Sequence, residues 1–470
     1  MTSKFFLTTP IYYVNDVPHI GHAYTTIAAD VVARYWRQEL GKDNVFFLTG
    51  TDEHGQKVAQ AAKEKGLSPK EFVDSVAPRF EEAWKLLNID YDYFIRTTDP
   101  KHESVVTDLL QKIYDAGYIY QGTYNGLYCV GCEKFLTESE LVDGKCPLHP
   151  NKEPVRQEEK NYFLKLKELS KVVLEKIEKS EYQILPEEKK KEIVSRIKQG
   201  VEDISISRAG VSWGIPVPWD KSQTIYVWVD ALINYYSATK FLKGKEEFWP
   251  ANLHLVGKDI LWFHTVIWQA ILIATDIPLP KTIFAHGFFT IDGAKMSKSL
   301  GNVISPQELV EKYGVDGARY LVVSAYPFGS DGDISLEKFN EEYNAHLANG
   351  IGNLVSRVAK LCENSGFEFP QEKVLKFDDL VEENIKNYHF DEALKNLFDR
   401  FISGLDSSIN KEEPWKLTGD NLKEFLTGSV SIIRNLSFNL RPFLPATSAS
   451  IEKQFLGPKI KSGPPLFPRL

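Results

Sequence analysis

Two short stretches of the chain carry the residue types that chemistry on phosphates needs. One lies near the N-terminus, where His19 and His22 flank Gly21. The other lies late in the chain, where Lys295 and Lys298 stand in a Lys-Met-Ser-Lys-Ser sequence. Imidazoles donate hydrogen bonds to phosphate oxygens, and ammonium groups neutralise their charge. Taken singly, each stretch also suits a turn or an exposed polar segment; together they predict a site that stabilises a triphosphate while its α-phosphate is attacked.

The first stretch stands immediately before a helical pattern. Apolar and aromatic residues recur at helical spacing over 23–40. His19 and Gly21 therefore fall at the helix N-terminus, where free N–H groups and the helix dipole favour an anion. The missing side chain of Gly21 leaves room for a nucleotide beside the backbone. The second stretch is flanked by Gly293 and Gly301, which suits a loop that closes.

The segments on either side of that helix favour strands. Apolar runs at 4–9 and 45–49 predict two parallel strands joined through the helix by a right-handed crossover. Ligands in such sheets bind beyond the carboxyl ends of the strands, so the loops expected at 9–13 and 50–55 should face one crevice. Later apolar runs that end in Asp, Gly or His predict further strands leading into it, at 224–230, 253–259 and 282–287.

Three of the four cysteines fall within one window, beside a histidine. Cys129 and Cys132 form a Cys-x-x-Cys pair, and Cys146 is followed closely by His149. Three thiolates and one imidazole at this spacing match a tetrahedral zinc knuckle, and four protein ligands close the site. We therefore expect one structural zinc ion per chain; reduced cysteines beside a surface histidine are the alternative. Cys362 suits an ordinary buried position on a helix.

Length and composition bound the class of protein. A chain of 470 residues, 43% of them hydrophobic, is expected to form two to four domains. We find no apolar run long enough to cross a membrane and no signal-peptide pattern, and therefore expect a cytoplasmic protein. Four cysteines are too few for a disulfide framework. The formal net charge of -8 counts against a uniformly basic nucleic-acid binder, but local basic patches are compatible with it.

The α/β pattern is interrupted and later replaced. From about 118 to 154, aromatic residues, glycines and cysteines replace helical periodicity, and 161–198 is charged and mostly helical. These segments predict an insertion into the nucleotide-binding fold. From 336 to about 456 the pattern is helical, which predicts a separate helix bundle. Prolines after 457 predict an extended tail.

Taken together, these stretches resemble the methionyl-tRNA synthetase family of class I aminoacyl-tRNA synthetases, in its bacterial form with a single zinc knuckle. The two basic stretches carry the resemblance. So do Thr-Pro-Ile-Tyr-Tyr-Val-Asn at 9–15, Gly-Thr-Asp-Glu-His-Gly at 50–55, Tyr-Val-Trp-Val-Asp-Ala-Leu at 226–232 and Gly-Lys-Asp-Ile at 257–260. The similarity covers essentially all 470 residues.

The resemblance implies an α/β fold with a Rossmann-like parallel sheet in the catalytic domain, interrupted by a zinc-binding insertion and followed by an α-helical anticodon-binding bundle. The implied domains are two catalytic halves at 1–117 and 221–290, a connective insertion at 118–220, a stem-contact region with the basic loop at 291–345, the bundle at 346–456 and a tail at 457–470. Larger relatives carry a further C-terminal domain that binds tRNA and dimerises. Without it, a monomer is expected.

The family's reaction has two steps. The carboxylate of methionine attacks the α-phosphate of ATP, giving methionyl-adenylate and pyrophosphate. The terminal ribose of the tRNA then takes the methionyl group. The resemblance therefore implies a methionine–tRNA ligase whose partners are ATP with Mg²⁺, L-methionine and tRNA(Met), including initiator tRNA.

The same resemblance assigns roles to residues of the methionine site. Asp52 would bind the methionine ammonium group, because a carboxylate fixes both charge and orientation. Its alternative role is to cap the helix after Gly55. Leu232 stands where the family often has proline. Sulfur–aromatic contacts favour the implied lining of the thioether pocket, which consists of Ile11, Tyr13, Trp228, Ala231, Tyr235, Phe263 and His264.

The resemblance also names an ATP site and an anticodon site. Asn353 and Arg357 are four residues apart and share a helix face, which with Trp415 would read the anticodon. A surface polar pair and a core tryptophan are the alternative. His19, His22, Lys295 and Lys298 would be catalytic, and Asp259 would bind the ribose hydroxyls. The whole implied ATP set is His19, Gly21, His22, Gly257, Asp259, Lys295 and Lys298.

Three other functions fit parts of the pattern. Another class I synthetase, such as the zinc-containing cysteine enzyme, is opposed by a zinc site with four closed ligands. A small-molecule nucleotidyltransferase of the same superfamily leaves the helix bundle and the insertion without a purpose. A non-catalytic tRNA-binding module is opposed by the two intact basic stretches.

Overall fold

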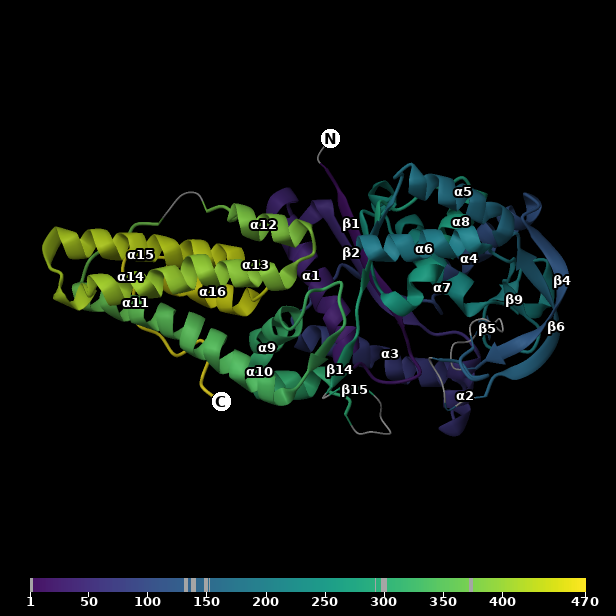
Figure 1. Cartoon of the computed structure of the whole chain (residues 1–470), viewed down its shortest axis with the longest axis horizontal. Helices are drawn as coiled ribbons and strands as arrows, with labels where there is room; N and C mark the ends of the chain where they lie inside the picture. Colours follow the sequence, from purple (N-terminus) through teal and green to yellow (C-terminus); the bar gives the residue numbers. More distant parts are fainter. Residues whose placement is uncertain are drawn as a thin grey trace. The chain divides into compact units, whose positions relative to one another are not determined.

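The computed structural model describes residues 3–130, 134–136, 141–147, 151, 153–291, 293–296, 302–371 and 375–470 (Figure 1). Two compact units make up the chain. Unit 1 consists of Met1–Val17, Asp43–Glu82 and Tyr91–Ala285, and unit 2 of Pro18–Lys42, Ala83–Asp90 and His286–Leu470. None of the helices in these described ranges is long and apolar enough to cross a membrane.

A six-stranded sheet forms the centre of unit 1, in the order β3-β2-β1-β12-β13-β7. The pairs β1–β2, β1–β12, β2–β3 and β13–β7 are all parallel. Strand order reverses between β1 and β12, and open α/β sheets bind ligands at such a switch point. The strands are β1 (Phe5–Tyr13), β2 (Val45–Asp52), β3 (Tyr93–Arg96), β7 (Gln183–Leu185), β12 (Leu253–Gly257) and β13 (Thr282–His286).

Helices of unit 1 supply the apolar partners of this sheet. One core cluster joins strand residues such as Phe6, Phe46 and Val256 to helix residues such as Val106 and Trp268. Pro100 opens α4 beside Asp99, whose side chain caps the helix. The helices are α2 (Gln56–Glu64), α3 (Pro69–Leu86, which ends in unit 2), α4 (Pro100–Asp115), α5 (Leu166–Glu178), α6 (Glu187–Gln199), α7 (Val227–Phe241) and α8 (Trp268–Ala274).

Three expectations about strands need correction. The segments expected as loops at 9–13 and 50–52 extend β1 and β2, with Tyr13 paired to Asp52 after a bulge. The run 224–230 does not form a strand of the main sheet: only its first two residues are extended, in a small antiparallel sheet, and α7 begins at Val227. The charged segment 161–198 also holds β7, which forms the edge of the main sheet beside β13. A three-residue edge strand between helices leaves too short a pattern to recognise.

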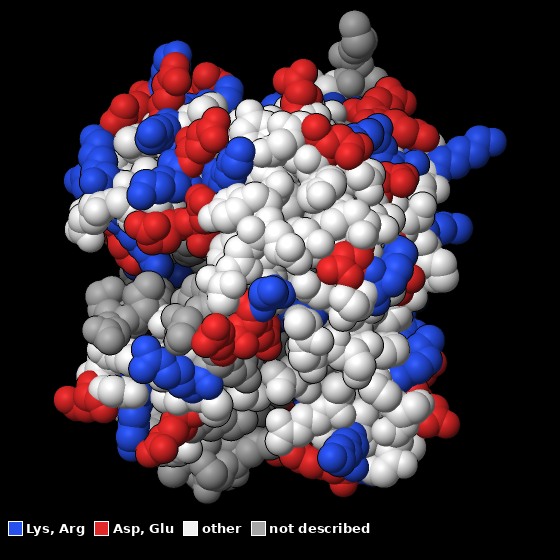
Figure 2. All heavy atoms as spheres, turned by 90° about the vertical axis from the view of Figure 1, so that its right-hand side faces the viewer, with Lys and Arg blue, Asp and Glu red and all other residues white. Residues whose placement is uncertain are grey.

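The segment that follows α4 forms two smaller sheets. Their orders are β5-β4-β6-β8 and β10-β11-β9. Val142 and Lys145 bridge across Asp143 and Gly144, which both have positive φ, as a tight hairpin turn requires. On the face drawn in Figure 2, basic and acidic side chains are interspersed around a broad uncharged area. The strands are β4 (Ile119–Cys129), β5 (Lys134–Leu136), β6 (Val155–Leu164), β8 (Ile204–Ser205), β9 (Ser207–Arg208), β10 (Pro216–Val217) and β11 (Asp220–Ile225).

Unit 2 is mainly helical. A small sheet, β15-β14-β16, is formed by Ala294–Lys295, Phe289–Ile291 and Gly332–Ile334. Ser305 and Glu308 form the capping box that begins α9. After β16 the described chain is helical, as predicted, and α11, α14, α15 and α16 run side by side in Figure 1. The helices are α1 (Ile20–Leu40), α9 (Pro306–Ser324), α10 (Leu336–Glu342), α11 (Asn353–Ser365), α12 (Asp379–Lys386), α13 (Phe390–Leu397), α14 (Gly404–Glu412), α15 (Gly419–Leu440) and α16 (Pro445–Gln454).

A buried ion pair connects distant segments of unit 2. Arg319 of α9 and Asp30 of α1 are both fully buried, and their charged atoms lie 2.7 Å apart. Arg319 also donates to the carbonyls of Phe443 and Leu87, while Asp30 accepts from the backbone N–H of Asp90. Burial opposes ionisation of Asp30. The neighbouring Arg319, with a smaller contribution from Arg34, outweighs burial and lowers the pKa of that carboxyl.

Removing this charge should destabilise unit 2. Asp30→Asn keeps the shape but leaves the Arg319 guanidinium buried without its carboxylate, which costs about 3–5 kcal/mol of unfolding free energy. Glu175→Gln, in an exposed pair with Lys179, is the control and should leave stability unchanged. The fold lowers the pKa of Asp30. Its ionised carboxylate therefore contributes fully to the unfolding free energy above the ordinary carboxyl pKa near 4, and this contribution is lost as the pH falls through the lowered pKa. Urea unfolding at pH 7 measures the loss; equal midpoints for Asp30→Asn and wild type would refute it.

Candidate functional site

The first basic stretch forms the N-terminus of α1, as its sequence predicts. His19 is the N-cap residue, and its Nδ1 accepts from the backbone N–H of Gly21 at 3.1 Å. The N–H of Ile20 donates to the carbonyl of Ile304 at 2.8 Å. The backbone N–H groups expected to be free at this helix end therefore already donate to groups of the protein. Hydrogen bonds to a bound phosphate would have to come from the imidazoles instead. This corrects the sequence expectation, because a histidine cap cannot be told from a histidine ligand by spacing alone.

Hydrogen bonds fix the tautomer of both imidazoles. The backbone N–H of His19 donates to Nδ1 of His22 at 3.1 Å, and the two rings stack with centroids 3.9 Å apart. Burial, with a smaller contribution from His19, holds the pKa of His22 well below its usual value, so the ring is neutral at pH 7. Since each Nδ1 accepts, the ring hydrogen of a neutral imidazole stands on Nε2. Both rings thus carry their N–H on the atom that can donate to an anionic oxygen.

The second basic stretch meets the first within unit 2. A Cβ built on Gly21 would lie 3.5 Å from Cε of Met296, and 2.9 Å from a ring carbon of His19. Any larger residue at this position would therefore displace the cap. Lys295 ends β15, with only its backbone described, and Lys298 lies outside the described residues. Gly21 of the first stretch and Met296 of the second, more than two hundred residues apart in sequence, are therefore neighbours in the fold.

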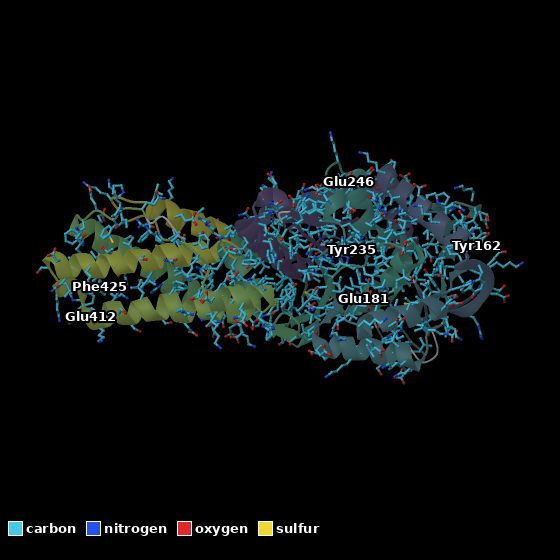
Figure 3. The ribbon with its side chains drawn as sticks, turned by 90° about the horizontal axis from the view of Figure 1, so that it is seen from above. Tyr162, Glu181, Tyr235, Glu246, Glu412 and Phe425 are labelled. Atoms are coloured by element: carbon cyan, nitrogen blue, oxygen red, sulfur yellow. The ribbon has the colours of Figure 1, made fainter. Side chains whose placement is uncertain are left out.

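In unit 1, a buried tyrosine and histidine lie beside the switch point of the sheet. Tyr235 of α7, labelled in Figure 3, donates to Nε2 of His264 at 2.7 Å. Nδ1 of His264 lies 2.9 Å from the carbonyl of Ile260. Burial lowers the pKa of His264 to about 4, so the ring is neutral, with its hydrogen on Nδ1. Burial raises the pKa of Tyr235, and the nearby Asp52 carboxylate adds to this effect. At pH 7 both groups are therefore uncharged.

Aromatic rings form a further wall of this region. Trp228 and Phe263 stack with centroids 4.0 Å apart. Phe263 and His264 begin a π-helical turn at Phe263–Ile267, a local distortion that often marks functional sites. Trp228, Phe263, Ile11 and Tyr13 are only partly buried, although they pack against the core of the unit. Partly exposed rings beside a buried core can line a pocket for an apolar ligand.

The end of β2 carries Asp52 in an ordered segment. Asp52 is 7% exposed, and Gly55, not Asp52, is the N-cap of α2, so the capping alternative is wrong. Its neighbour Glu53 is fully buried and receives two hydrogen bonds from Arg96, at 2.6 and 3.0 Å. The indole N–H of Trp213 donates to the carbonyl of Glu53 at 2.6 Å. The backbone that carries Asp52 is therefore held on both sides.

Two other candidate residues follow β12. Gly257 ends that strand, and Asp259 is exposed on the short 3₁₀ turn after it. Within the sheet, the Thr8 hydroxyl and Nδ1 of His254 lie 2.8 Å apart, linking β1 to β12 at the switch point. Sequence reasoning missed this pair, because each residue stands inside an apolar strand pattern. The remaining ATP candidates, at 19–22 and 295–298, belong to unit 2.

A second set of buried polar residues, which the sequence did not predict as a cluster, is centred on Asp230 of α7. Asp230 contacts two histidines, His54 and His102, at 2.7 and 2.8 Å. His102 occupies the buried stripe of α4 together with Val106 and Leu109. A histidine at a helix position that otherwise repeats apolar residues is the signal that could have revealed it.

The described half of the predicted zinc knuckle is compact. Cys129 and Cys146 are each 1% exposed, in one cluster with Leu136 and the partly buried Leu141. Cys132 and His149 lie outside the described residues. Within the ranges that the structure describes, no group of three or more metal-binding side chains occurs. Two thiol side chains gathered in one small cluster, with little apolar core of its own, fit a metal-stabilised segment.

The anticodon candidates of the helix bundle lie at its surface. Asn353 is exposed, and Arg357 pairs with Asp406 and donates to Asn410 at 2.9 Å. Trp415 is 58% exposed on the short turn after α14, so the alternative of a core tryptophan is wrong. Figure 3 labels Glu412, the last residue of α14, at the end of this helical region.

Comparison with known proteins identifies the family. The family model described as tRNA synthetases class I (M) matches residues 5–154 and 148–359. The methionine–tRNA ligase of Caldanaerobacter subterraneus is 41% identical over 512 residues, covering 100% of this chain and 79% of that protein. That of Thermosynechococcus vestitus is 40% identical, covering 100% and 93%. The Mycobacterium tuberculosis methionyl-tRNA synthetase in complex with methionyl-adenylate superposes with a TM-score of 0.92 at 33% identity, covering 99% of this chain and 100% of that one.

These relatives do not support the cysteine enzyme, the small-molecule nucleotidyltransferase or the non-catalytic module as alternatives. The family match covers most of the chain, and both similar ligases span all of it. The chain therefore belongs to the methionyl-tRNA synthetases, the class I aminoacyl-tRNA synthetases that ligate methionine to tRNA.

Proposed function

We propose that this chain activates L-methionine with ATP and transfers the methionyl group to the terminal ribose of tRNA(Met), initiator tRNA included. A carboxylate oxygen of methionine attacks the α-phosphorus of ATP. The bond from that phosphorus to the bridging oxygen breaks, so methionyl-adenylate forms and pyrophosphate leaves. A hydroxyl of the terminal ribose then attacks the carbonyl carbon of the adenylate, its bond to the phosphate oxygen breaks, and the methionyl ester forms as AMP leaves. ATP enters as its magnesium complex, and Mg²⁺ is thus part of the substrate.

The meeting of the two basic stretches in unit 2 carries this proposal. Nε2–H of His19 and of His22 are the proposed donors for phosphate oxygens, and Met296 of the second stretch lies beside Gly21 of the first. Lys295 and Lys298 neutralise the charge that builds on the leaving pyrophosphate. Fixed donors and cations of this kind act mainly on the transition state. In unit 1, Gly257 and Asp259 would contact the nucleotide, with Asp259 on the ribose hydroxyls.

Recognition of methionine is assigned to the switch-point region of unit 1. Asp52 binds the ammonium group from a backbone that Glu53 and Trp213 hold in place. Tyr235 and His264 are neutral and bonded to each other, so they offer the thioether a wall without charge. Sulfur in contact with aromatic rings is favourable. Partners of these residues in the apolar pocket are Ile11, Tyr13, Trp228, Ala231 and Phe263.

Three further assignments complete the proposal. Cys129, Cys132, Cys146 and His149 would hold one structural zinc ion, which supplies stability and no chemistry. Asn353, Arg357 and Trp415 would contact the anticodon. Exposed Trp415 offers an indole face on which an unstacked base can lie. The monomeric state and the cytoplasmic location stay predictions.

Methionine recognition and phosphate chemistry should separate in the kinetics. Asp52→Asn should raise KM for methionine roughly 30-fold or more in ATP–pyrophosphate exchange, because losing one partner of a hydrogen-bonded charge costs about 2–5 kcal/mol. KM for ATP should stay within about threefold.

Lys298→Ala should instead lower kcat on the order of 10²-fold at unchanged methionine KM. Exchange that responds equally to all twenty amino acids, or wild-type exchange in Lys298→Ala, would remove the proposed function.

Zinc should be bound stoichiometrically. Protein purified without added metal should contain one zinc ion per chain by elemental analysis, and Cys129→Ser or Cys146→Ser should lose it. Cys362→Ala is the matched control, since Cys362 is equally buried but lies on α11. Zinc retained by both knuckle variants, or lost from the control, contradicts the assignment.

Trp415 should affect tRNA charging alone. Base stacking on an aromatic ring is worth about 1–3 kcal/mol, so Trp415→Ala should reduce charging efficiency roughly 5- to 150-fold. Pyrophosphate exchange without tRNA and the melting temperature should stay as in wild type, since the ring is mostly exposed. Leu456→Ala, at a similarly exposed apolar residue of unit 2, should charge tRNA normally. Normal charging by Trp415→Ala would exclude the indole from the anticodon site.

A further inference from the structure

A buried carboxylate in unit 1 holds two histidines at once. Asp230 is 1% exposed; its Oδ2 lies 2.7 Å from Nδ1 of His54, and its Oδ1 lies 2.8 Å from Nε2 of His102. Nδ1 of His102 lies 2.7 Å from the hydroxyl of Ser237. His54, His102 and Ser237 are themselves buried. No step proposed above uses any of these four side chains.

The charges of this network favour an ionised Asp230. Burial opposes ionisation, but His54 and His102 outweigh it and lower the pKa of the Asp230 carboxyl. Burial likewise opposes protonation of His54, but Asp230, Glu103 and Glu53 together raise its pKa. An ionised carboxylate only accepts, so both imidazoles must donate to it. Each oxygen of Asp230 therefore fixes one ring.

The network lies on the back of the helix that carries the proposed pocket. With about 100° per residue, Trp228, Ala231 and Tyr235 fall within about 60° of one another on α7. Asp230 and Ser237 fall about 180° away from Trp228, on the opposite face. That face packs against α4, which carries His102. The same helix thus has a pocket face and an anchored face.

The hydrogen-bond network of Asp230 also includes a residue of the segment that carries Asp52. His54 follows Asp52 by two residues, between the end of β2 and the start of α2. Arg96 and Trp213 hold the neighbouring Glu53. The bond from His54 to Asp230 links this segment directly to α7.

We infer that Asp230 is a positioning residue for methionine: it fixes α7 against α4 and against the segment after β2, so that the pocket side chains and Asp52 face one ligand. This inference rests on the proposed methionine site. Asp230 does not touch the substrate; it acts through Trp228 and Ala231 on one side and through Asp52 on the other. Misplacement of such groups by about 1 Å costs up to 10²-fold in efficiency.

The test is Asp230→Asn in methionine-dependent ATP–pyrophosphate exchange. The carboxamide keeps the shape, but its NH₂ group faces an imidazole N–H, so one histidine loses its acceptor. KM for methionine should rise about 10- to 100-fold. KM for ATP should stay within about twofold, because none of the residues proposed to contact the nucleotide lies on α7 or in the segment after β2. A merely structural role would not separate the two constants.

Two further variants guard against a loss of folding. Ile233→Ala removes buried apolar volume from the same helix and should lower the melting temperature without changing KM for methionine. His54→Gln should raise KM for methionine as Asp230→Asn does. When Asp230→Asn and His54→Gln are combined, the rise in KM for methionine should equal the larger of the two single rises, because both changes break the same hydrogen bond.

Three outcomes would overturn the inference: unchanged methionine KM in Asp230→Asn, a KM rise of the same size in Ile233→Ala, or fully additive effects in the double variant. Failure of the proposed function would look different. In that case Asp52→Asn would also leave methionine KM unchanged, or the wild type would show no methionine-dependent exchange. A functional wild type with a sensitive Asp52 and an insensitive Asp230 would reject the positioning role alone.

Discussion

Unit 2 depends on one buried ion pair, that of Asp30 with Arg319. A charge taken out of water is tolerated only when a partner and further hydrogen bonds replace the lost hydration. Arg319 meets this requirement with backbone carbonyls from two other segments, and Asp30 meets it with the N–H of Asp90. The pair therefore fixes α1 against α9. Since α1 begins with the first basic stretch and α9 follows the second, this packing constrains where both stretches meet.

Histidines throughout the candidate site have partners that set their protonation. His19 and His22 accept at Nδ1 from backbone N–H groups, whereas His264 donates from Nδ1 to a carbonyl. Burial lowers the pKa of His264 and of His22, so they act as neutral donors or acceptors. His54 differs, because neighbouring carboxylates raise its pKa. In the proposed function, histidine thus serves as phosphate donor, pocket wall and partner of a positioning residue, according to the groups around it.

Local features of the chain were predictable because short-range physics determines them. Helical periodicity with a capping residue gave α1 and its start at the first basic stretch, and the apolar runs gave β1, β2, β12 and β13. The helical region after β16 followed from periodicity alone. The functional family followed from six short motifs in one order. Strand register and the three-residue strand β7 did not follow, because a run that short has no period to detect.

The sequence by itself therefore determined the types of chemistry and the elements that carry them. Tertiary structure alone decided which of these residues meet: Met296 lies beside Gly21, and Asp230 between His54 and His102. It also decided that Trp415 is exposed and that the N–H groups of α1 are already bonded. The physical reason is that burial and pairing depend on residues far apart in the chain, whereas periodicity and spacing report only on near neighbours.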